Sequence, residues 1–313
     1  MAREKGLFLP SPCHDWQESP FQKPKVFWGG PAALHGGTLH HSGTSRRRWS
    51  MASADLESLA QALKQGRVAV LTGAGCSTES GIPDYRGSQG LWKRHPTELG
   101  TVYGMETWPE EFYAFYAARV RALKEARPNK AHRVLARFQK EGLLEALITQ
   151  NVDGLHQAAG ATDVIEVHGS MAHTRCQRCG RKDSPDRLLE PVTGRDDRPA
   201  CRHCGGPMRP DIVLYGEQLP PEAMSRAWQA ARSCRLFLVV GTSLQVAPVS
   251  HLPGEALLAG ASLAIINLDP TPYDGRATWV IREKAGEALG RLAELMGLEL
   301  EEEEAPPTAN ASH

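Results

Sequence analysis

The sequence predicts an α/β fold in which helices cover both faces of a parallel sheet and a small four-cysteine zinc-ribbon module is inserted. Apolar runs at 68–72, 143–149, 236–243 and 262–269 alternate with helical patterns at 109–125, 129–141, 221–232 and 284–296. Such alternation is typical of parallel sheets, whose strands are buried on both faces. Two C-x-x-C pairs interrupt the alternation. The expected architecture is therefore Rossmann-like, with the zinc module at 171–210.

The overall composition is that of a globular chain without charge bias. The 313 residues are 41% hydrophobic and carry 36 basic and 36 acidic side chains, so the formal net charge is zero. A neutral chain gives no electrostatic support for nucleic-acid binding. No apolar run approaches the roughly 20 residues that cross a bilayer. We therefore expect neither a nucleic acid nor a membrane as partner.

Both ends of the chain differ in composition from the middle. Residues 1–52 are rich in Pro, Gly, His, Trp and Arg without periodicity, and residues 299–313 form an acidic tail. We expect both segments to be disordered. The three arginines at 46–48 are interpreted as solvated rather than as a targeting patch. Translation starting at Met51 is a separate hypothesis, which mapping the N-terminus of protein made from the native gene would test.

Residues 53–298 are expected to form the folded domain. Ser53 is the predicted N-cap of its first helix, which Gly66 ends. The strand at 68–72 then leads into a glycine-rich loop, where Gly73 and Gly75 would let backbone N–H groups approach a phosphate. A nucleotide is therefore the first ligand to consider.

The loop departs from the dinucleotide fingerprint G-x-G-x-x-G. Thr78 stands where the third glycine would be, and a polar stretch continues to Arg86. A stretch of this length suits a cover over the reactive end of a ligand better than a simple turn.

Polar residues follow the other strands as well. Because the carboxyl ends of parallel strands meet at one edge of the sheet, ligands gather there. After the second run, Gln150, Asn151 and Asp153 are suited to hydrogen-bond a ribose and a carboxamide. Helix capping by Asn151 or Asp153 is an equally open interpretation.

One histidine has a setting that suits catalysis. His168 ends a short apolar run and precedes Gly169, where it could act as a general base with a pKa near neutrality. The alternative is a structural role, which is commoner for a lone histidine. We expect His132, His156 and His173 to be structural.

The cysteines predict a metal site. Cys176-x-x-Cys179 and Cys201-x-x-Cys204 are separated by 21 residues, close to the spacing of four-cysteine zinc ribbons. Four thiolates fill a tetrahedral shell and leave no position for water, so one structural Zn²⁺ is expected. A redox dithiol and a nucleic-acid-binding ribbon are the alternatives. Paired cysteines with an odd total of seven favour a reducing compartment, and we expect a cytoplasmic protein.

Several motifs occur together in this chain. They are GAGCSTESGIPDYR at 73–86, TQNVDGLH at 149–156, HGS at 168–170, the two C-x-x-C pairs, PDIVLYGE at 210–217, GTSLQVAPV at 241–249 and INLD at 266–269. In order and spacing, over about residues 54–298, they resemble the sirtuin family.

This resemblance implies an NAD-dependent protein-lysine deacylase. In such enzymes the acyl oxygen of a modified lysine attacks the ribose carbon that bears nicotinamide, and nicotinamide leaves. A histidine matching His168 then deprotonates a ribose hydroxyl, and the products are free lysine and O-acyl-ADP-ribose. The implied catalytic residues are His168, Asn151 and Arg86. The implied NAD contacts are Gly73, Ala74, Gly75, Asp84, Tyr85, Arg86, Trp92, Gln150, Asn151, Val152, Asp153, Gly241, Thr242, Ser243, Asn267, Leu268, Asp269 and Ala285.

The resemblance also implies where a substrate peptide binds. Val213, Leu214 and Tyr215 suit an extended edge that pairs with the peptide by strand addition, although Leu214 replaces a usual aromatic residue. Tyr85 replaces the commoner phenylalanine, and Cys76 replaces an aliphatic residue. Neither change removes a catalytic group.

A pair on a predicted helix bears on the acyl group. Tyr116 and Arg119 stand three apart, hence on one face. They match the Tyr-x-x-Arg pair of family members that accept succinyl and malonyl groups, whose carboxylate an arginine fork can bind. The alternative is a surface arginine, because Tyr113 and Arg121 make the register ambiguous.

Three other functions remain as alternatives. A dehydrogenase would explain the sheet and the loop, but not the zinc module or the His168 motif. A non-enzymatic zinc-ribbon adaptor would not need His168. Mono-ADP-ribosyl transfer shares the loss of nicotinamide and differs only in the acceptor.

Overall fold

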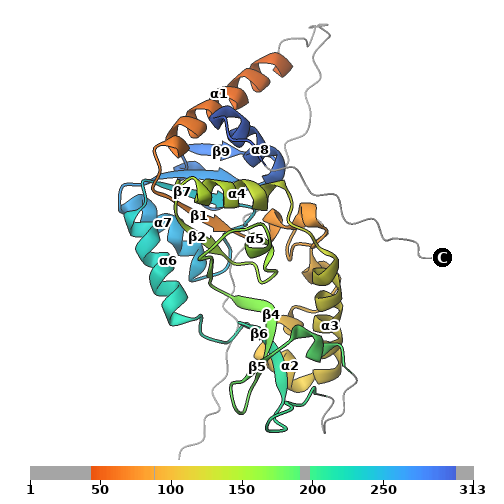
Figure 1. The fold of residues 1–313 in the computed structure, drawn as a ribbon. Helices are drawn as coiled ribbons and strands as arrows, with labels where there is room; N and C mark the ends of the chain where they lie inside the picture. Colours follow the sequence, from red (N-terminus) through yellow and green to blue (C-terminus); the bar gives the residue numbers. More distant parts are fainter. Residues whose placement is uncertain (1–43, 88, 191–197, 301–313) are drawn as a thin grey trace, which may run out of the picture. The chain divides into compact units, whose positions relative to one another are not determined.

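The computed structural model describes residues 44–87, 89–190 and 198–300. In this part, six strands form a sheet in the order β3-β2-β1-β7-β8-β9 (Figure 1). All neighbouring pairs in the sheet are parallel. The predicted parallel sheet is confirmed, and two short strands, β3 and β9, extend it. The strands are β1 (Val68–Thr72), β2 (Leu144–Thr149), β3 (Ile165–Glu166), β7 (Leu236–Val240), β8 (Ser262–Ile266) and β9 (Trp279–Ile281).

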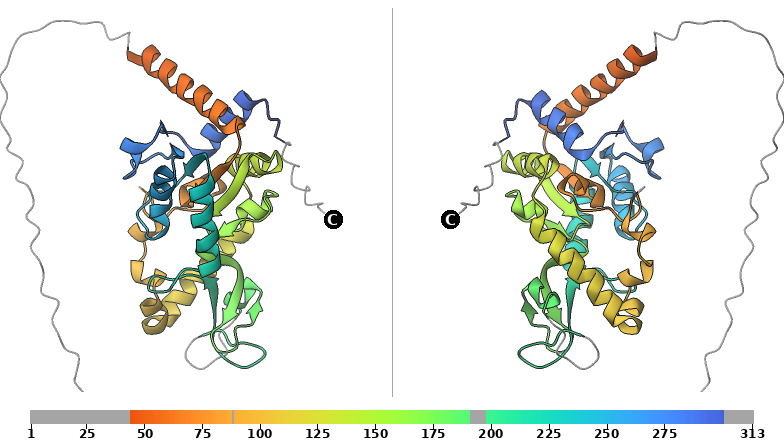
Figure 2. Two further views of the ribbon diagram at one scale, coloured as in Figure 1. Left: turned by 90° about the vertical axis from the view of Figure 1, so that its left-hand side faces the viewer. Right: turned by 90° about the vertical axis from the view of Figure 1, so that its right-hand side faces the viewer.

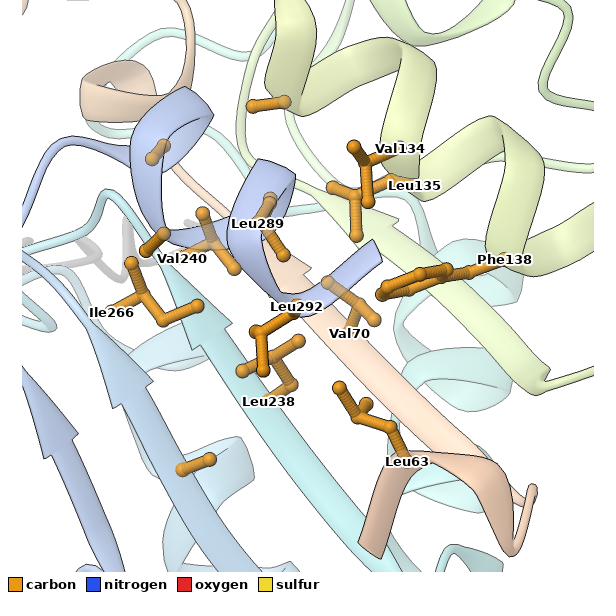
Figure 3. Close-up of a cluster of buried hydrophobic side chains, with 14 of the residues drawn as sticks. Leu63, Val70, Val134, Leu135, Phe138, Leu238, Val240, Ile266, Leu289 and Leu292 are labelled. Carbon is orange, nitrogen blue, oxygen red and sulfur yellow. The ribbon is translucent and has the colours of Figure 1, made fainter. Parts of the chain in front are cut away.

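Helices cover both faces of the sheet, as predicted. Along β1, Val70 packs into a core formed with α1, α4 and α8, whereas Ala69 and Leu71 pack into a second core formed with α6 and α7. This division follows from the alternation of side chains along a strand. Figure 3 shows the first core, where Phe138 and Leu292 lie over Val70 and Leu238. The helices are α1 (Thr44–Lys64), α4 (Lys130–Lys140), α5 (Leu155–Ala158), α6 (Pro221–Ser233), α7 (Leu252–Leu258) and α8 (Ala285–Met296).

The first helix is longer than predicted. It begins at Thr44, so Ser53 lies inside α1 and is not its N-cap. The disorder predicted for residues 1–52 is therefore wrong for 44–52. That stretch contains neither Gly nor Pro, so no residue in it interrupts a helix. The rest of the predicted extension and the tail from 301 lie outside the described residues, and no described helix combines the length and apolar character needed to cross a membrane.

A second, smaller sheet carries the cysteines. It has the order β5-β4-β6, with antiparallel pairing of β4 (Gly169–Cys176) to both β5 (Lys182–Asp183) and β6 (Met208–Ile212). This sheet packs with α2 (Val102–Thr107) and α3 (Pro109–Glu125) through a third core. Figure 2 shows both helices beside the small sheet. The bounds predicted for the helix at 109–125 are confirmed, but its place next to the cysteine module was not predicted.

Candidate functional site

A cavity of about 690 Å³ lies where loops from the large sheet meet the smaller module. Its walls include the segments that follow β1, β2, β7 and β8, which are the carboxyl ends where ligands were expected. Most of the predicted site residues line it. These are Gly73, Ala74, Gly75, Asp84, Tyr85, Arg86, Trp92, Tyr116, Gln150, Asn151, Val152, His168, Val213, Leu214, Tyr215, Gly241, Thr242, Ser243, Asn267 and Asp269.

Four predicted residues lie outside the lining of this cavity. Leu268 is 59% exposed, and Ala285 is buried at the start of α8. Asp153 accepts a hydrogen bond from Ser77, and Arg119 lines a different cavity. For these four, the predicted contacts with a ligand stay predictions.

The structure also adds lining residues that sequence reasoning missed. Met224 and Trp228 reach the cavity from α6, and residues 216–219 and 245–248 contribute from loops. The sequence could have identified residues 245–248 as part of the site, because they belong to the GTSLQVAPV motif. The inward face of α6 gave no such signal, since its apolar stripe is typical of any core helix.

His168 is held in a defined tautomer. Its Nδ1 lies 3.0 Å from the carbonyl oxygen of Gln150. A carbonyl oxygen only accepts, so Nδ1 must carry the hydrogen and Nε2 keeps its lone pair. Burial lowers the pKa of His168, and the bond to Gln150 opposes this shift. His168 is therefore suited to accept a proton at Nε2 at neutral pH.

The glycine-rich loop packs against the loop after β7. The N–H of Gly73 donates to Val240 O at 3.0 Å, and the N–H of Gly75 donates to Gly241 O at 2.8 Å. A Cβ on Gly75 would lie 2.9 Å from the Cα of Gly241. The N–H groups of Gly73 and Gly75 are thus used within the protein, and the approach of other N–H groups of the loop to a phosphate stays a prediction. The glycines are needed because two backbones approach closely, and Ala74 lies between them at the cavity.

A buried network fixes the residues after β2. The side-chain amide of Asn151 donates to Gly73 O at 3.1 Å and to Ser77 Oγ at 3.0 Å, and Ser77 in turn donates to Asp153 at 2.7 Å. Both N–H groups of Asn151 are thus used by the protein, which leaves Oδ1 as its remaining polar atom. Asp153 accepts from the N–H of Leu155 at the start of α5, but the N-cap of this helix is Gly154, so neither Asn151 nor Asp153 is its cap.

In the segment 213–215, which is predicted to pair with a peptide, every backbone N–H group already donates to another part of the protein. The N–H of Val213 donates to His168 O, that of Leu214 to Glu217 Oε2, and that of Tyr215 to Gly100 O, each at 2.8 Å. All three backbone donors are therefore occupied, and the predicted pairing with a peptide strand would have to replace these bonds. The side chains of the segment still line the cavity.

A buried ion pair holds this edge. Arg209 is 3% exposed and forms a bidentate pair with Glu217, at 2.6 and 2.8 Å. Arg209 also donates to Ile212 O at 2.6 Å. Because Glu217 accepts from Leu214 as well, the pair links strand β6 to the segment that follows it.

Tyr85 and Arg86 connect the loop after β1 to other elements. Arg86 donates to the hydroxyl of Tyr215 at 2.7 Å. Arg119 donates from Nη2 to the hydroxyl of Tyr85 at 2.9 Å, and its guanidinium lies over the Tyr85 ring. Tyr116, by contrast, lines the cavity directly. The predicted pair is thus split, with Tyr85 between Arg119 and the cavity.

The four cysteines converge as predicted. Cys176 and Cys204 have their sulfurs 3.6 Å apart, those of Cys179 and Cys201 are 3.9 Å apart, and all four lie within 4.8 Å of one another. Four sulfurs bound at about 2.3 Å in a tetrahedron lie about 3.8 Å from each other. The donor set therefore fits one Zn²⁺ with no open position, which assigns the ion a structural role.

Two of the other histidines are buried beneath the loop after β1. His132 Nδ1 accepts from the N–H of Asn129 in a capping box, and His156 Nε2 lies 2.9 Å from Thr72 Oγ1. Burial lowers the pKa of His132 to about 4 and that of His156 to about 3. His173 is exposed.

The fold and the cavity together define a nucleotide-binding α/β protein with a four-cysteine zinc-ribbon module. A profile of the Sir2 family matches residues 73–248. The chain is 46% identical over 228 residues to NAD-dependent protein deacetylase 1 of Geobacillus kaustophilus, covering 72% of this chain and 91% of that one. It is 41% identical over 247 residues to the NAD-dependent protein deacylase of Aeropyrum pernix, covering 77% and 97%.

Solved structures agree with this. A Sir2 variant with a deacetylated p53 peptide and 3'-O-acetyl ADP-ribose aligns with a TM-score of 0.73 at 37% identity, covering 78% of this chain and 99% of that one. A Sir2 protein bound to a propionylated peptide aligns with a TM-score of 0.71 at 36% identity, with the same coverage. The chain belongs to the Sir2 family.

Proposed function

We propose that the protein is an NAD-dependent protein-lysine deacylase whose catalytic domain spans residues 53–298. The observation that carries this is the neutral His168, with Nε2 free as a base, in a cavity at the carboxyl ends of the large sheet. The relatives named above as deacetylase and deacylase match 72% and 77% of this chain. None of the six cysteines among the described residues forms a disulfide, which supports a reducing, cytoplasmic setting.

The proposed reaction consumes NAD. The acyl oxygen of the modified lysine attacks the ribose carbon and displaces nicotinamide. His168 Nε2 takes a proton from a ribose hydroxyl, which then attacks the acyl carbon, and water completes release of lysine and O-acyl-ADP-ribose. A Michaelis complex needs a dry cavity, because water would intercept the sugar cation. Arg86 and Tyr215 are suited to close it, since both line the cavity and their hydrogen bond joins the loop after β1 to the segment after β6.

Asn151 and Gln150 are proposed to orient the NAD. Asn151 is 8% exposed, and its amide donors are fixed by Gly73 and Ser77, so Oδ1 is presented in one orientation. Gln150 donates to Thr242 Oγ1 at 2.9 Å, which joins the loops after β2 and β7. An acceptor held in this way suits the carboxamide N–H₂ of nicotinamide, and the bound Zn²⁺ would hold the module without entering the reaction.

The test is a panel of acetyl-, propionyl-, succinyl- and malonyl-lysine peptides incubated with NAD, wild type against His168→Ala. Mass spectrometry should detect nicotinamide and O-acyl-ADP-ribose with wild type only, and no NADH absorbance should develop. A modified protein in place of the acylated sugar would instead identify mono-ADP-ribosyl transfer. Intact NAD with every peptide would overturn the proposal.

Acyl selectivity is the finer part of the proposal. Arg119 donates to the hydroxyl of Tyr85, which lines the cavity together with Tyr116, and a succinyl carboxylate could replace that hydroxyl on Arg119. Arg119→Met should then lower desuccinylation far more than deacetylation. If desuccinylation and deacetylation lose the same activity in this variant, Arg119 does not select the acyl group, and the deacylase proposal is unaffected.

A further inference from the structure

A second cavity lies on the outer side of α3. It has a volume of about 720 Å³, which is within the range of small-molecule sites. One wall comes from residues 82–83 and 91–99, which follow the glycine-rich loop, and the other from α3. The lining is almost entirely apolar and comprises Ile82, Pro83, Leu91, Pro96, Leu99, Trp108, Ala114, Phe115, Ala118, Ala122 and Leu123, with His95, Glu111 and Arg119.

Arg119 is the feature that distinguishes this cavity from an ordinary apolar groove. Its guanidinium lies 5.2 Å from the ring centre of Tyr85 and 5.8 Å from that of Phe115. Its Nε is buried without a hydrogen-bond partner among the described residues, and no described carboxylate pairs with it. A guanidinium that is partly removed from water and lacks an anion is an unsatisfied site for one.

The other charged group of the lining does not satisfy Arg119. Glu111 lies two helical turns away on α3 and is exposed, so water solvates its carboxylate. The apolar wall between them is made of Ala114 and Ala118, whose small side chains leave room along the helix. The cavity thus offers a cation at one end and an apolar channel beside it.

We propose that this cavity binds an amphipathic monocarboxylate, with the carboxylate on Arg119 and the apolar body along α3. The apolar lining along α3 has no part in the proposed deacylation reaction, whereas Arg119 is also the residue proposed above to bind a succinyl carboxylate. The carboxylate would exchange with the Tyr85 hydroxyl on Nη2, which replaces a hydrogen bond to a neutral hydroxyl with an ion pair. Because Tyr85 lines the first cavity, binding in the second would also alter the wall of the first.

The experiment measures binding of decanoate, below its micelle concentration, to the full chain without NAD or peptide. Isothermal titration and the fluorescence of Trp108, which lines the cavity, report the affinity, with Trp108→Phe as the control for the signal. We expect saturable binding, and at least tenfold weaker binding of decanol and of decyltrimethylammonium. Equal affinity for acid and alcohol, or no saturable binding, would overturn the proposal.

Variants locate the site. Arg119→Gln should weaken decanoate binding at least tenfold, whereas Arg121→Gln, an exposed arginine of the same helix outside the cavity, should leave it unchanged. Ala118→Phe should fill the channel and also abolish binding, which keeps the test decisive if Arg119→Gln does not fold. Tyr85→Phe should bind decanoate as tightly as wild type or more so. A tenfold loss with Arg121→Gln, or none with Arg119→Gln and Ala118→Phe, would contradict the assignment.

Because no substrate is present, these measurements do not depend on the deacylase activity. Failure of decanoate to bind would leave the proposed function intact, and an inactive enzyme could still bind the acid.

Discussion

His168 Nδ1 and the carbonyl oxygen of Gln150 lie 3.0 Å apart, so the strand that ends at the cavity also sets the tautomer of the proposed base. The same histidine accepts the N–H of Val213 through its own carbonyl. His168 is therefore held by the residue that follows β2 of the large sheet and by the residue that follows β6 of the small sheet. A base held in this way needs no rearrangement before it takes a proton.

The first prediction concerns the pH dependence of deacylation. Activity needs neutral His168 and falls as the pH drops through its pKa. Burial lowers that pKa below the ordinary value of about 6.5 in the unliganded protein, so wild type should keep more than half of its plateau kcat/KM at pH 6.5. His168→Ala should lower kcat by roughly 10²- to 10⁴-fold. The pH profile of kcat/KM measures this, and an acid limb centred above pH 6.5 would contradict it.

A glycine substitution tests the packing of the two loops. Gly241 has a φ of +63°, and a Cβ there would lie 2.3 Å from the N of Cys76. Gly260 has a φ of +89° but open space around it. Gly260→Ala should therefore cost only the conformational strain, about 1 kcal/mol, whereas Gly241→Ala should cost clearly more and raise the KM for NAD. Urea denaturation of both variants gives the comparison, and equal losses of stability would refute the packing argument.

Contacts between segments that are distant in the sequence could not be predicted. The strands at 68–72 and 262–266 and the helix at 109–125 could be predicted because apolar periodicity is local. That Gly75 packs on Gly241 could not, since a glycine that faces a phosphate and one that faces another backbone have the same local pattern. Sequence spacing likewise put Tyr116 and Arg119 on one helix face, but only the folded chain shows Tyr85 between that arginine and the cavity.

The cysteine cluster gives a prediction for metal removal. Because four thiolates fit one structural ion, a chelator strong enough to remove Zn²⁺ should unfold the module and lower the melting temperature, and added Zn²⁺ should restore it. Cys179→Ser should lower the zinc content per chain, measured by atomic absorption, whereas Cys234→Ser should not, since Cys234 lies in the core beside α6. Full zinc content in Cys179→Ser would contradict the assignment.

The buried ion pair at the peptide edge predicts a stability loss. Glu217→Ala would leave Arg209, which is 3% exposed, without its carboxylate, at a cost of about 3 kcal/mol. Glu294→Ala breaks an exposed pair with Lys130 and should cost less than about 1 kcal/mol. Glu217→Ala should also raise the KM for peptide more than that for NAD, because it frees the segment at 213–215. Denaturation midpoints that do not differ between the two variants would show that the pair does not hold this edge.

The last prediction concerns acid stability. His132 and His156 are buried as neutral side chains with pKa values of about 4 and about 3 in the folded protein, against about 6.5 unfolded. Above pH 6.5 neither state binds the proton, so stability does not change. As the pH falls below 6.5, the unfolded chain takes up protons that the folded chain does not, and each histidine removes about 2 kcal/mol by pH 5.

His156→Gln removes one of these groups and keeps a polar side chain beside Thr72, so it should roughly halve the loss of stability that these two histidines cause between pH 7.5 and pH 5. The zinc module is also acid-sensitive, but it is the same in both proteins, so the difference between them isolates the histidine. His173→Gln is the matched control, because His173 is exposed. The measurement is the urea midpoint of unfolding at the two pH values. If the midpoint of His156→Gln falls with pH as much as that of wild type, this histidine is not buried in its neutral form.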